Sequence, residues 1–197
     1  MRGLSSTYHA AVGAIDAANA ADPTTISVRG RVLPLALAHG RLAAEWVLTL
    51  HPDADELVLL AARAHHLRRW EVARRSYPAG RGGYLAWKRD QRQRHAVDVA
   101  ALLETVGYPA ADIARVQEMV RRDRLATDVG SQAVEDAACL VFIETQLADV
   151  AQRLDHDLLI GVLRKTARKL SPAGAAAIAD IPLVAAERAL LDEALQS

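Results

Sequence analysis

The sequence predicts an all-α protein that folds as a single-domain helical bundle. Hydrophobic residues make up 51% of the 197 residues, and much of that fraction is alanine and leucine, whereas aromatic residues make up only 4%. This composition, with its few β-branched runs, favours helices over strands. Apolar residues also recur at helical spacing, and no repeat or long linker divides the chain. We therefore expect one domain over residues 1–197, with a core at about 10–150 and C-terminal helices at 153–197.

In the N-terminal part, the sequence predicts three helices and a weak hairpin. The first helix covers residues 7–20 and ends at an Asp-Pro turn. The stretch TTISVRGRV has weak strand character, and its glycine indicates a loop or a small hairpin. A second helix starts after Pro34, because apolar residues then follow at helical spacing. A third helix, with Asp53 as its expected cap, ends near the adjacent histidines His65 and His66.

In the C-terminal part, the sequence predicts a loop and then a series of helices. The stretch RRSYPAGRGGY at residues 74–84 contains one proline and three glycines, so we expect a loop there. Helical patterns then cover residues 84–106 and 110–122. The next helix has Asp128 or Ser131 as its expected N-cap. The last part, from Asp155 onward, is helical with breaks near Pro172 and at Pro182.

The charged residues exclude some partners and indicate one. The chain has 24 basic and 24 acidic side chains, so its formal net charge is zero. This balance gives no support for a membrane partner or for general binding to nucleic acids. The segment 63–94 is nevertheless heavily basic, whereas 135–157 is mostly acidic. We therefore expect a small anionic substrate as the partner of a local site.

The expected compartment is the cytoplasm. Cys139, the single cysteine, cannot form an internal disulfide and fits a reducing environment. The N-terminus lacks the apolar region of a signal peptide, and no apolar run approaches the roughly 18 residues of a transmembrane helix. The alanine-rich C-terminal helices leave open whether the protein forms a homodimer.

The histidines carry most of the functional information in the sequence. We expect three of them to be solvated surface or capping residues, namely His9, His51 and His156. The other four are candidates for a site, and these are His39, His65, His66 and His95. His39 and His65 lie on the apolar faces of their helices, where burying an imidazole without a partner costs about 1–3 kcal/mol. Each is therefore either a hydrogen-bonded core histidine or a ligand.

Two adjacent carboxylates lie in the apolar helix that contains the cysteine. Asp136 is expected to tilt toward the core, where an ionised carboxylate needs a counter-charge, hydrogen-bond donors or a metal. Glu135 turns about 100° away and is a candidate for moving protons. Inward-facing His39, His65 and Asp136 would bring two imidazoles and one carboxylate from three helices into one core, as in the metal sites of helical bundles.

The order of these residues resembles the HD-domain superfamily of metal-dependent phosphohydrolases, whose pattern is H…HD…D. His39 matches the first His, His65 the His of the doublet, and Asp136 the final Asp. More closely, the segments AIDAANAADP, AHHLRRWEV, SYPAGRGGYLAWK and EDAACLVFIE resemble the domain of unknown function family 4202, over about residues 14–147. The resemblance implies an HD-domain-like helical fold and metal-dependent hydrolysis.

One position departs from the superfamily pattern, because His66 stands where the doublet has Asp. The change removes a negative charge and a bridging oxygen, which disfavours a binuclear site and Mg²⁺. The resemblance then implies one divalent transition metal as the cofactor, namely Zn, Fe, Mn, Ni or Co. The ligands implied are His39, His65 and Asp136, with His66 or His95 as a further ligand or an acid/base group.

A basic and aromatic segment follows the histidine doublet. Its arginines offer planar forks for phosphate or carboxylate, and its adjacent glycines can present backbone N–H groups to an anion. The alternative is a solvated loop whose aromatic residues pack on its own arginine stems. The predicted substrate-binding residues are Arg68, Arg69, Arg81, Tyr84 and Lys88.

Together, these patterns predict a metal-dependent hydrolase that acts on a small phosphorylated or nucleotide-type compound. In this hypothesis, Glu135 or His66 moves protons during hydrolysis. The first alternative is an HD-type iron-dependent oxygenase that uses the additional histidines as ligands. The second is a non-catalytic metal- or ligand-binding helical protein, which would explain the loss of the doublet Asp.

Overall fold

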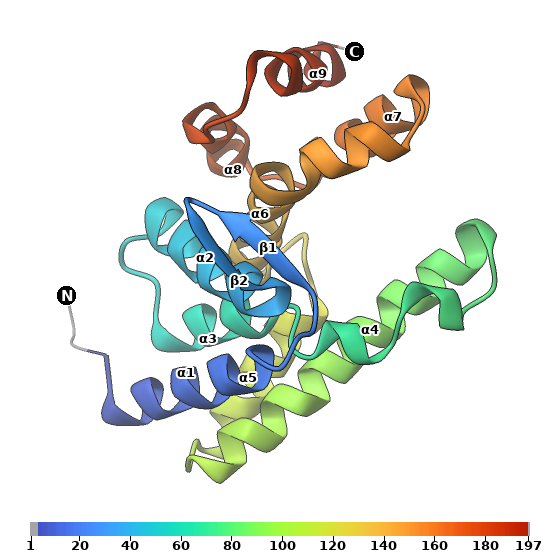
Figure 1. Ribbon diagram of the computed structural model, residues 1–197. Helices are drawn as coiled ribbons and strands as arrows, with labels where there is room; N and C mark the ends of the chain where they lie inside the picture. Colours follow the sequence, from blue (N-terminus) through green and yellow to red (C-terminus); the bar gives the residue numbers. More distant parts are fainter. Residues whose placement is uncertain (1–3, 197) are drawn as a thin grey trace.

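The computed structural model describes residues 4–196 as a bundle of helices with one short hairpin (Figure 1). The all-α prediction and the predicted hairpin are confirmed, since β1 (Thr25–Val28) pairs antiparallel with β2 (Arg31–Pro34). The helices are α1 (Ser6–Asn19), α2 (Leu35–Leu50), α3 (Glu56–Ala64), α4 (Gly80–Thr105), α5 (Ala110–Arg121), α6 (Val129–Arg153), α7 (His156–Ala167), α8 (Pro172–Ala177) and α9 (Ala185–Leu195). Short 3₁₀ turns are η1 (Arg69–Glu71), η2 (Arg74–Ser76) and η3 (Ile178–Asp180).

Three helices, α2, α3 and α6, pack against one another at the centre of the molecule. The apolar stripe predicted for the second helix faces inward, because Ala38, Leu42 and Trp46 are all buried in α2. Helix α1 packs against α2 and α3, and α5 packs against α3 and α4 (Figure 1). Buried apolar side chains from α1 to α9 form one continuous cluster. Every helix in the described part of the chain is too short or too polar to cross a membrane.

Aspartate caps set the starts of the central helices. Of the two caps expected for α6, Asp128 is the one observed, because its carboxylate accepts the backbone N–H of Ser131. The expected cap of the third helix is wrong, however: Asp55, not Asp53, accepts the N–H of Val58 at 2.9 Å. A cap must lie two or three residues before the N–H it binds, and α3 begins only at Glu56.

The glycine-rich segment predicted as a loop over residues 74–84 is only partly a loop. Helix α4 begins within it, so the last glycines form its first turn. A Cβ atom built on Gly83 would lie 1.9 Å from the carbonyl oxygen of Pro78, so this glycine allows the turn to pack directly on the preceding chain. The Arg74 guanidinium holds that chain by donating to the carbonyls of Tyr77 and Pro78.

We expect Gly83→Ala to lower the free energy of unfolding by about 1–3 kcal/mol, because its methyl group meets backbone that must move. The matched control is Gly82→Ala in the same helical turn, where nothing lies within 4 Å of the added Cβ. That substitution should raise stability by about 0.5 kcal/mol through helix propensity. Urea denaturation followed by circular dichroism measures both, and equal effects would contradict the packing role of Gly83.

Candidate functional site

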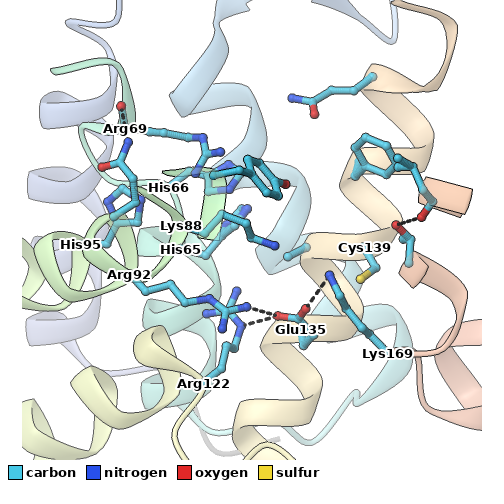
Figure 2. A pocket seen from close by; sticks show the side chains of 17 residues that line it. His65, His66, Arg69, Lys88, Arg92, His95, Arg122, Glu135, Cys139 and Lys169 are labelled. Atoms are coloured by element: carbon cyan, nitrogen blue, oxygen red, sulfur yellow. Dashed lines mark hydrogen bonds and ion pairs between the residues drawn. The ribbon is translucent and has the colours of Figure 1, made fainter. Parts of the chain in front are cut away.

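A cavity of about 240 Å³ lies between α4, α6, α7 and the chain that follows α3. Figure 2 shows that its walls carry many nitrogen-bearing side chains and few carboxylates. The lining residues are His65, His66, Arg69, Tyr84, Lys88, Gln91, Arg92, His95, Arg122, Glu135, Ala138, Cys139, Phe142, Gln146, Val162, Thr166 and Lys169. The cavity therefore gathers the histidine doublet, the basic segment and one predicted carboxylate.

Helix α4 supplies one complete wall of the cavity. Tyr84, Lys88, Arg92 and His95 recur three or four residues apart, so they lie on one face of the helix. The helix is fixed to the preceding segment by Gln91, whose amide donates to the carbonyl of Arg69 at 2.8 Å. The wall and the chain after the histidine doublet are thus held together.

Glu135 organises the basic side chains on one side of the cavity. Its carboxylate lies 3.0 Å from Arg122 and 3.2 Å from Arg92, and its second oxygen is 3.4 Å from Lys169 (Figure 2). Burial by itself would raise the pKa of Glu135, but the charges of Arg122, Arg92 and Lys169 outweigh it and lower this pKa to about 2. At neutral pH the group is therefore an ionised anchor for three cations.

Two further cations, Arg69 and Lys88, line the cavity without an ion-pair partner in residues 4–196. The Arg69 guanidinium lies 4.4 Å from the centre of the Trp87 ring, and burial lowers its pKa to about 10. Burial, followed by the charges of Lys169 and Arg92, lowers the pKa of Lys88 to about 8. Five cations and one carboxylate thus line the cavity, so its charge is positive, and Arg69 and Lys88 are the two cations that Glu135 does not pair.

The four candidate histidines lie together, as Figure 2 shows for three of them. The ring centre of His66 is 4.1 Å from that of His65, 5.5 Å from that of His39 and 6.2 Å from that of His95. The ring of His66 therefore lies among those of the other three histidines. His39, His65 and His95 are buried, whereas His66 is partly buried.

A chain of hydrogen bonds assigns the protons of two of these rings. The Thr145 hydroxyl donates to the Val141 carbonyl at 2.7 Å, so it accepts from Nε2–H of His39 at 3.2 Å. Nδ1 of His39 is then unprotonated and accepts from Nδ1–H of His66, 3.3 Å away. Nε2 of His66 consequently carries a free lone pair. His66 also lines the cavity, which makes this nitrogen the ring atom best able to meet a ligand.

The other two histidines contain buried nitrogens without partners. Nδ1 of His65 donates to the carbonyl of Ala62 at 2.7 Å, which leaves Nε2 unprotonated. This Nε2 and both ring nitrogens of His95 have no hydrogen-bonding partner among the described residues. Burial, and then the charge of Arg122, lowers the pKa of His65 well below its usual value. The neutral rings therefore add basic groups to the cavity without adding charge.

Asp136 has a different environment from the histidines. It is fully buried, and its carboxylate accepts from the backbone N–H and hydroxyl of Ser171 and from the amide of Gln132 at 2.8 Å. These bonds attach the start of α8 to α6, and Asp136 is not among the residues that line the cavity. The tilt toward the core is confirmed, and the need for a partner is met by a donor network.

The metal ligands implied by the HD resemblance do not fit one ion as the side chains are placed. Both ring nitrogens of His39 are used by Thr145 and His66, and Asp136 is bound to Ser171. Among residues 4–196, no three His, Cys, Asp or Glu side chains form a group able to hold a metal. The cavity charge, which is positive, also favours an anion over a cation.

The predicted substrate-binding residues divide into two groups. Arg69, Tyr84 and Lys88 line the cavity. Arg68 instead lies 4.0 Å from Glu71 at the surface, and Arg81 is exposed at the start of α4; neither lines the cavity.

Sequence reasoning missed three cations of the cavity, which are Arg92, Arg122 and Lys169. For Arg92 a signal was present, since it follows Lys88 by one helical turn on the same face. Arg122 and Lys169 follow the ends of α5 and α7, and their approach to Glu135 depends on how these helices pack.

The buried histidines predict that the protein loses stability as the pH falls from about 6.5 toward about 4. An unfolded histidine has a pKa of about 6.5, whereas burial, followed by the charge of Arg69, lowers the pKa of His39 to about 4 and that of His95 to about 3. The unfolded chain therefore binds protons that the folded chain excludes. Each such histidine lowers the free energy of unfolding by about 1.4 kcal/mol per pH unit in this window, and the full stability is present above it.

Urea denaturation at several pH values measures this slope. It should be shallower in His95→Leu, which removes one buried imidazole, and unchanged in His9→Gln, because His9 is exposed. A slope that is equal in the wild type and in His95→Leu would contradict the neutral state of this histidine.

Comparison with known proteins places the chain in a family. Residues 9–191 match the family described as a domain of unknown function (DUF4202), which confirms the closer of the two resemblances. The chain matches no curated protein and no solved structure. The matched range includes the histidine doublet, the basic segment and Glu135. Because the match covers nearly the whole sequence, the chain belongs to this family of a domain of unknown function (DUF4202).

Proposed function

We propose that the protein binds a small phosphorylated compound in the cavity and hydrolyses its phosphate ester. The observation that carries this proposal is the position of Arg69 and Lys88, two cations that line a partly enclosed cavity and have no carboxylate partner in residues 4–196. A desolvated, uncompensated cation is unfavourable by itself and is stabilised when an anion enters. The phosphoryl group supplies that anion.

Each cation has a distinct task in the proposed complex. Arg69, held over the Trp87 ring, presents a planar fork that binds two phosphoryl oxygens. Lys88 adds a point charge, and its pKa of about 8 rises when the anion binds. The ion pairs of Glu135 with Arg92 and Arg122 join the α4 wall and the end of α5 to α6. The site is therefore organised before the ligand arrives.

In the proposed reaction, His66 is the general base. Its Nε2 takes a proton from the water that attacks phosphorus, the P–O ester bond breaks, and the imidazolium returns the proton to the leaving oxygen. The products are an alcohol and inorganic phosphate, so atoms and charge balance. His39 holds the base, because its Nδ1 accepts the Nδ1–H of His66 at 3.3 Å. Glu135, ionised and paired with cations, binds no proton at neutral pH.

A second candidate function is phosphate binding without turnover. It is favoured by the low basicity of the proposed base: burial, and then the charges of His65 and Arg69, lower the pKa of His66 well below its usual value. An efficient general base has a pKa near the working pH. A bound phosphoryl dianion offsets the positive charge of Arg69 and so raises the pKa of His66. Hydrolysis requires that this rise bring the pKa near the working pH, whereas binding without turnover does not.

We also propose that the fold is a divergent HD-type scaffold. In support, α2, α3 and α6, which carry the residues matched to the HD pattern, pack against one another, and His39 and His65 both lie beside His66. The third matched residue, Asp136, joins α8 to α6 instead. No step of the proposed reaction is assigned to a metal.

The cationic site predicts loss of phosphate binding in two variants. Arg69→Gln and Lys88→Gln should each weaken the affinity for inorganic phosphate about 10- to 100-fold, because each removes a charge-assisted contact worth roughly 1.5–3 kcal/mol. Isothermal titration calorimetry measures the affinity. The matched control Arg81→Gln removes an exposed arginine of α4 outside the cavity and should leave it unchanged.

Turnover separates the two candidate functions. Phosphate release from a panel of phosphorylated metabolites should be lost in His66→Gln while the affinity for inorganic phosphate is retained. Wild-type protein that binds phosphate but releases none from the panel would favour the non-catalytic function. Protein that binds no phosphate would contradict both.

The placement of Asp136 makes a separate prediction about metals. Treatment with EDTA should leave phosphate affinity unchanged, because Arg69 and Lys88 hold the anion directly. Asp136→Asn should lower the free energy of unfolding by about 1–3 kcal/mol, since a charge-assisted acceptor of three hydrogen bonds is weakened, yet it should leave phosphate affinity unchanged. If EDTA abolishes binding and Zn²⁺ or Mn²⁺ restores it in the wild type but not in Asp136→Asn, the HD-type metal site is supported instead.

A further inference from the structure

A second cavity of about 290 Å³ adjoins the first. His66, Arg69 and Gln146 line both cavities, so these three side chains form the boundary between them. The other residues of the second cavity come from the start of α2, the chain before the hairpin, the η1 region and α4; they are Asp22, Thr24, Leu35, Ala36, His39, Trp70, Val72, Ala73 and Trp87.

The second cavity differs in chemistry from the first. Two tryptophans and four aliphatic side chains form half of its lining. Its carboxylate, Asp22, is satisfied, because one oxygen accepts the N–H of Thr24 at 2.9 Å and the other that of Ala36 at 3.0 Å. The ring nitrogens of His39 are also occupied. Among the described residues, the charged side chains of this wall are Arg69 at the boundary and Asp22, which is held by backbone N–H groups.

The boundary is held firmly by α4. The indole N–H of Trp87 and the amide of Gln91 both donate to the carbonyl of Val72, at 3.0 and 3.1 Å. Gln91 donates to the carbonyl of Arg69 as well. The Arg69 guanidinium, stacked on Trp87, therefore stands on a fixed segment with one cavity on each side.

We propose that the two cavities form one site for a ligand in which a phosphate is attached to an uncharged aromatic ring. The phosphate occupies the cationic cavity, the ring lies against Trp70 and Trp87, and the bond between them passes Arg69 and His66. This inference rests on the proposed function and adds the class of substrate. A second anionic group is disfavoured in this cavity because the Asp22 carboxylate lines it, whereas the two tryptophans offer an apolar surface on which an aromatic ring can pack.

A pair of phosphonates tests the ring subsite on the full-length protein. Methylphosphonate and phenylphosphonate carry the same anionic group and resist hydrolysis, so their affinities differ only through the ring. We expect phenylphosphonate to bind at least about tenfold more tightly by isothermal titration calorimetry, because the second cavity removes its apolar surface from water. Methylphosphonate is the matched control for the anionic cavity.

Two variants locate the effect. Trp70→Ala removes an aromatic side chain that would contact the ring, whereas Ala73→Phe adds a bulky side chain that occupies the space of the ring. Because the two substitutions change the cavity in opposite ways, a folding defect in one variant leaves the other informative. Both should reduce the preference for phenylphosphonate to about twofold or less and leave methylphosphonate affinity unchanged.

The possible failures are distinguishable. If methylphosphonate binds and phenylphosphonate binds no better, the ring subsite is overturned while the proposed function stands. A wild-type preference that persists in folded Ala73→Phe also overturns it, because the ring must then lie elsewhere. If neither phosphonate nor inorganic phosphate binds, the proposed function fails, and the inference fails with it.

Discussion

The arrangement of the cavity depends on one buried carboxylate, Glu135. It joins α6 to the residues after α5 and α7 through Arg122 and Lys169, and to α4 through Arg92. Arg122 also donates to the carbonyls of Met119 and Val120, so the same side chain closes the end of α5. Removing one partner from such a buried network leaves the others uncompensated, which costs several kcal/mol. Without Glu135, the cations that surround the cavity would repel one another.

Beside the cations, three histidines of the wall, His65, His66 and His95, add groups that are basic but uncharged, and His39 lies behind His66. Burial and nearby arginines keep the pKa of each below neutrality, so the cavity gains lone pairs without further repulsion. Burial beside arginines also makes the fold sensitive to acid, since each proton that binds a histidine there adds a positive charge close to Arg69 or Arg122. The excess of buried positive charge therefore both favours the binding of an anion and disfavours the protonation of the histidines.

Much of the fold was predictable because helix signals are local. Apolar spacing and two candidate caps, Asp128 and Ser131, located α6, and the proline breaks located the C-terminal helices. The failures were local rules overridden by packing. The glycines before Tyr84 are typical of a loop, yet α4 begins at Gly80, and Gly83 lies in its first turn because the carbonyl of Pro78 leaves no room for a side chain there. Asp53 and Asp55 look alike in sequence, and only the position of the first helical turn distinguishes them.

For the site, the sequence by itself determined which residues are candidates: the histidine doublet ends an apolar helix, Arg69, Tyr84 and Lys88 belong to the basic, aromatic segment that follows it, and all of these line the cavity. Tertiary structure alone decided which of them act together. Asp136 turns out to bind Ser171, 35 residues along the chain, and Glu135, its neighbour, faces the cavity with Arg122 and Lys169. Periodicity tells which way a side chain points from its own helix, but contacts between distant segments depend on how the helices pack, and no local pattern records that.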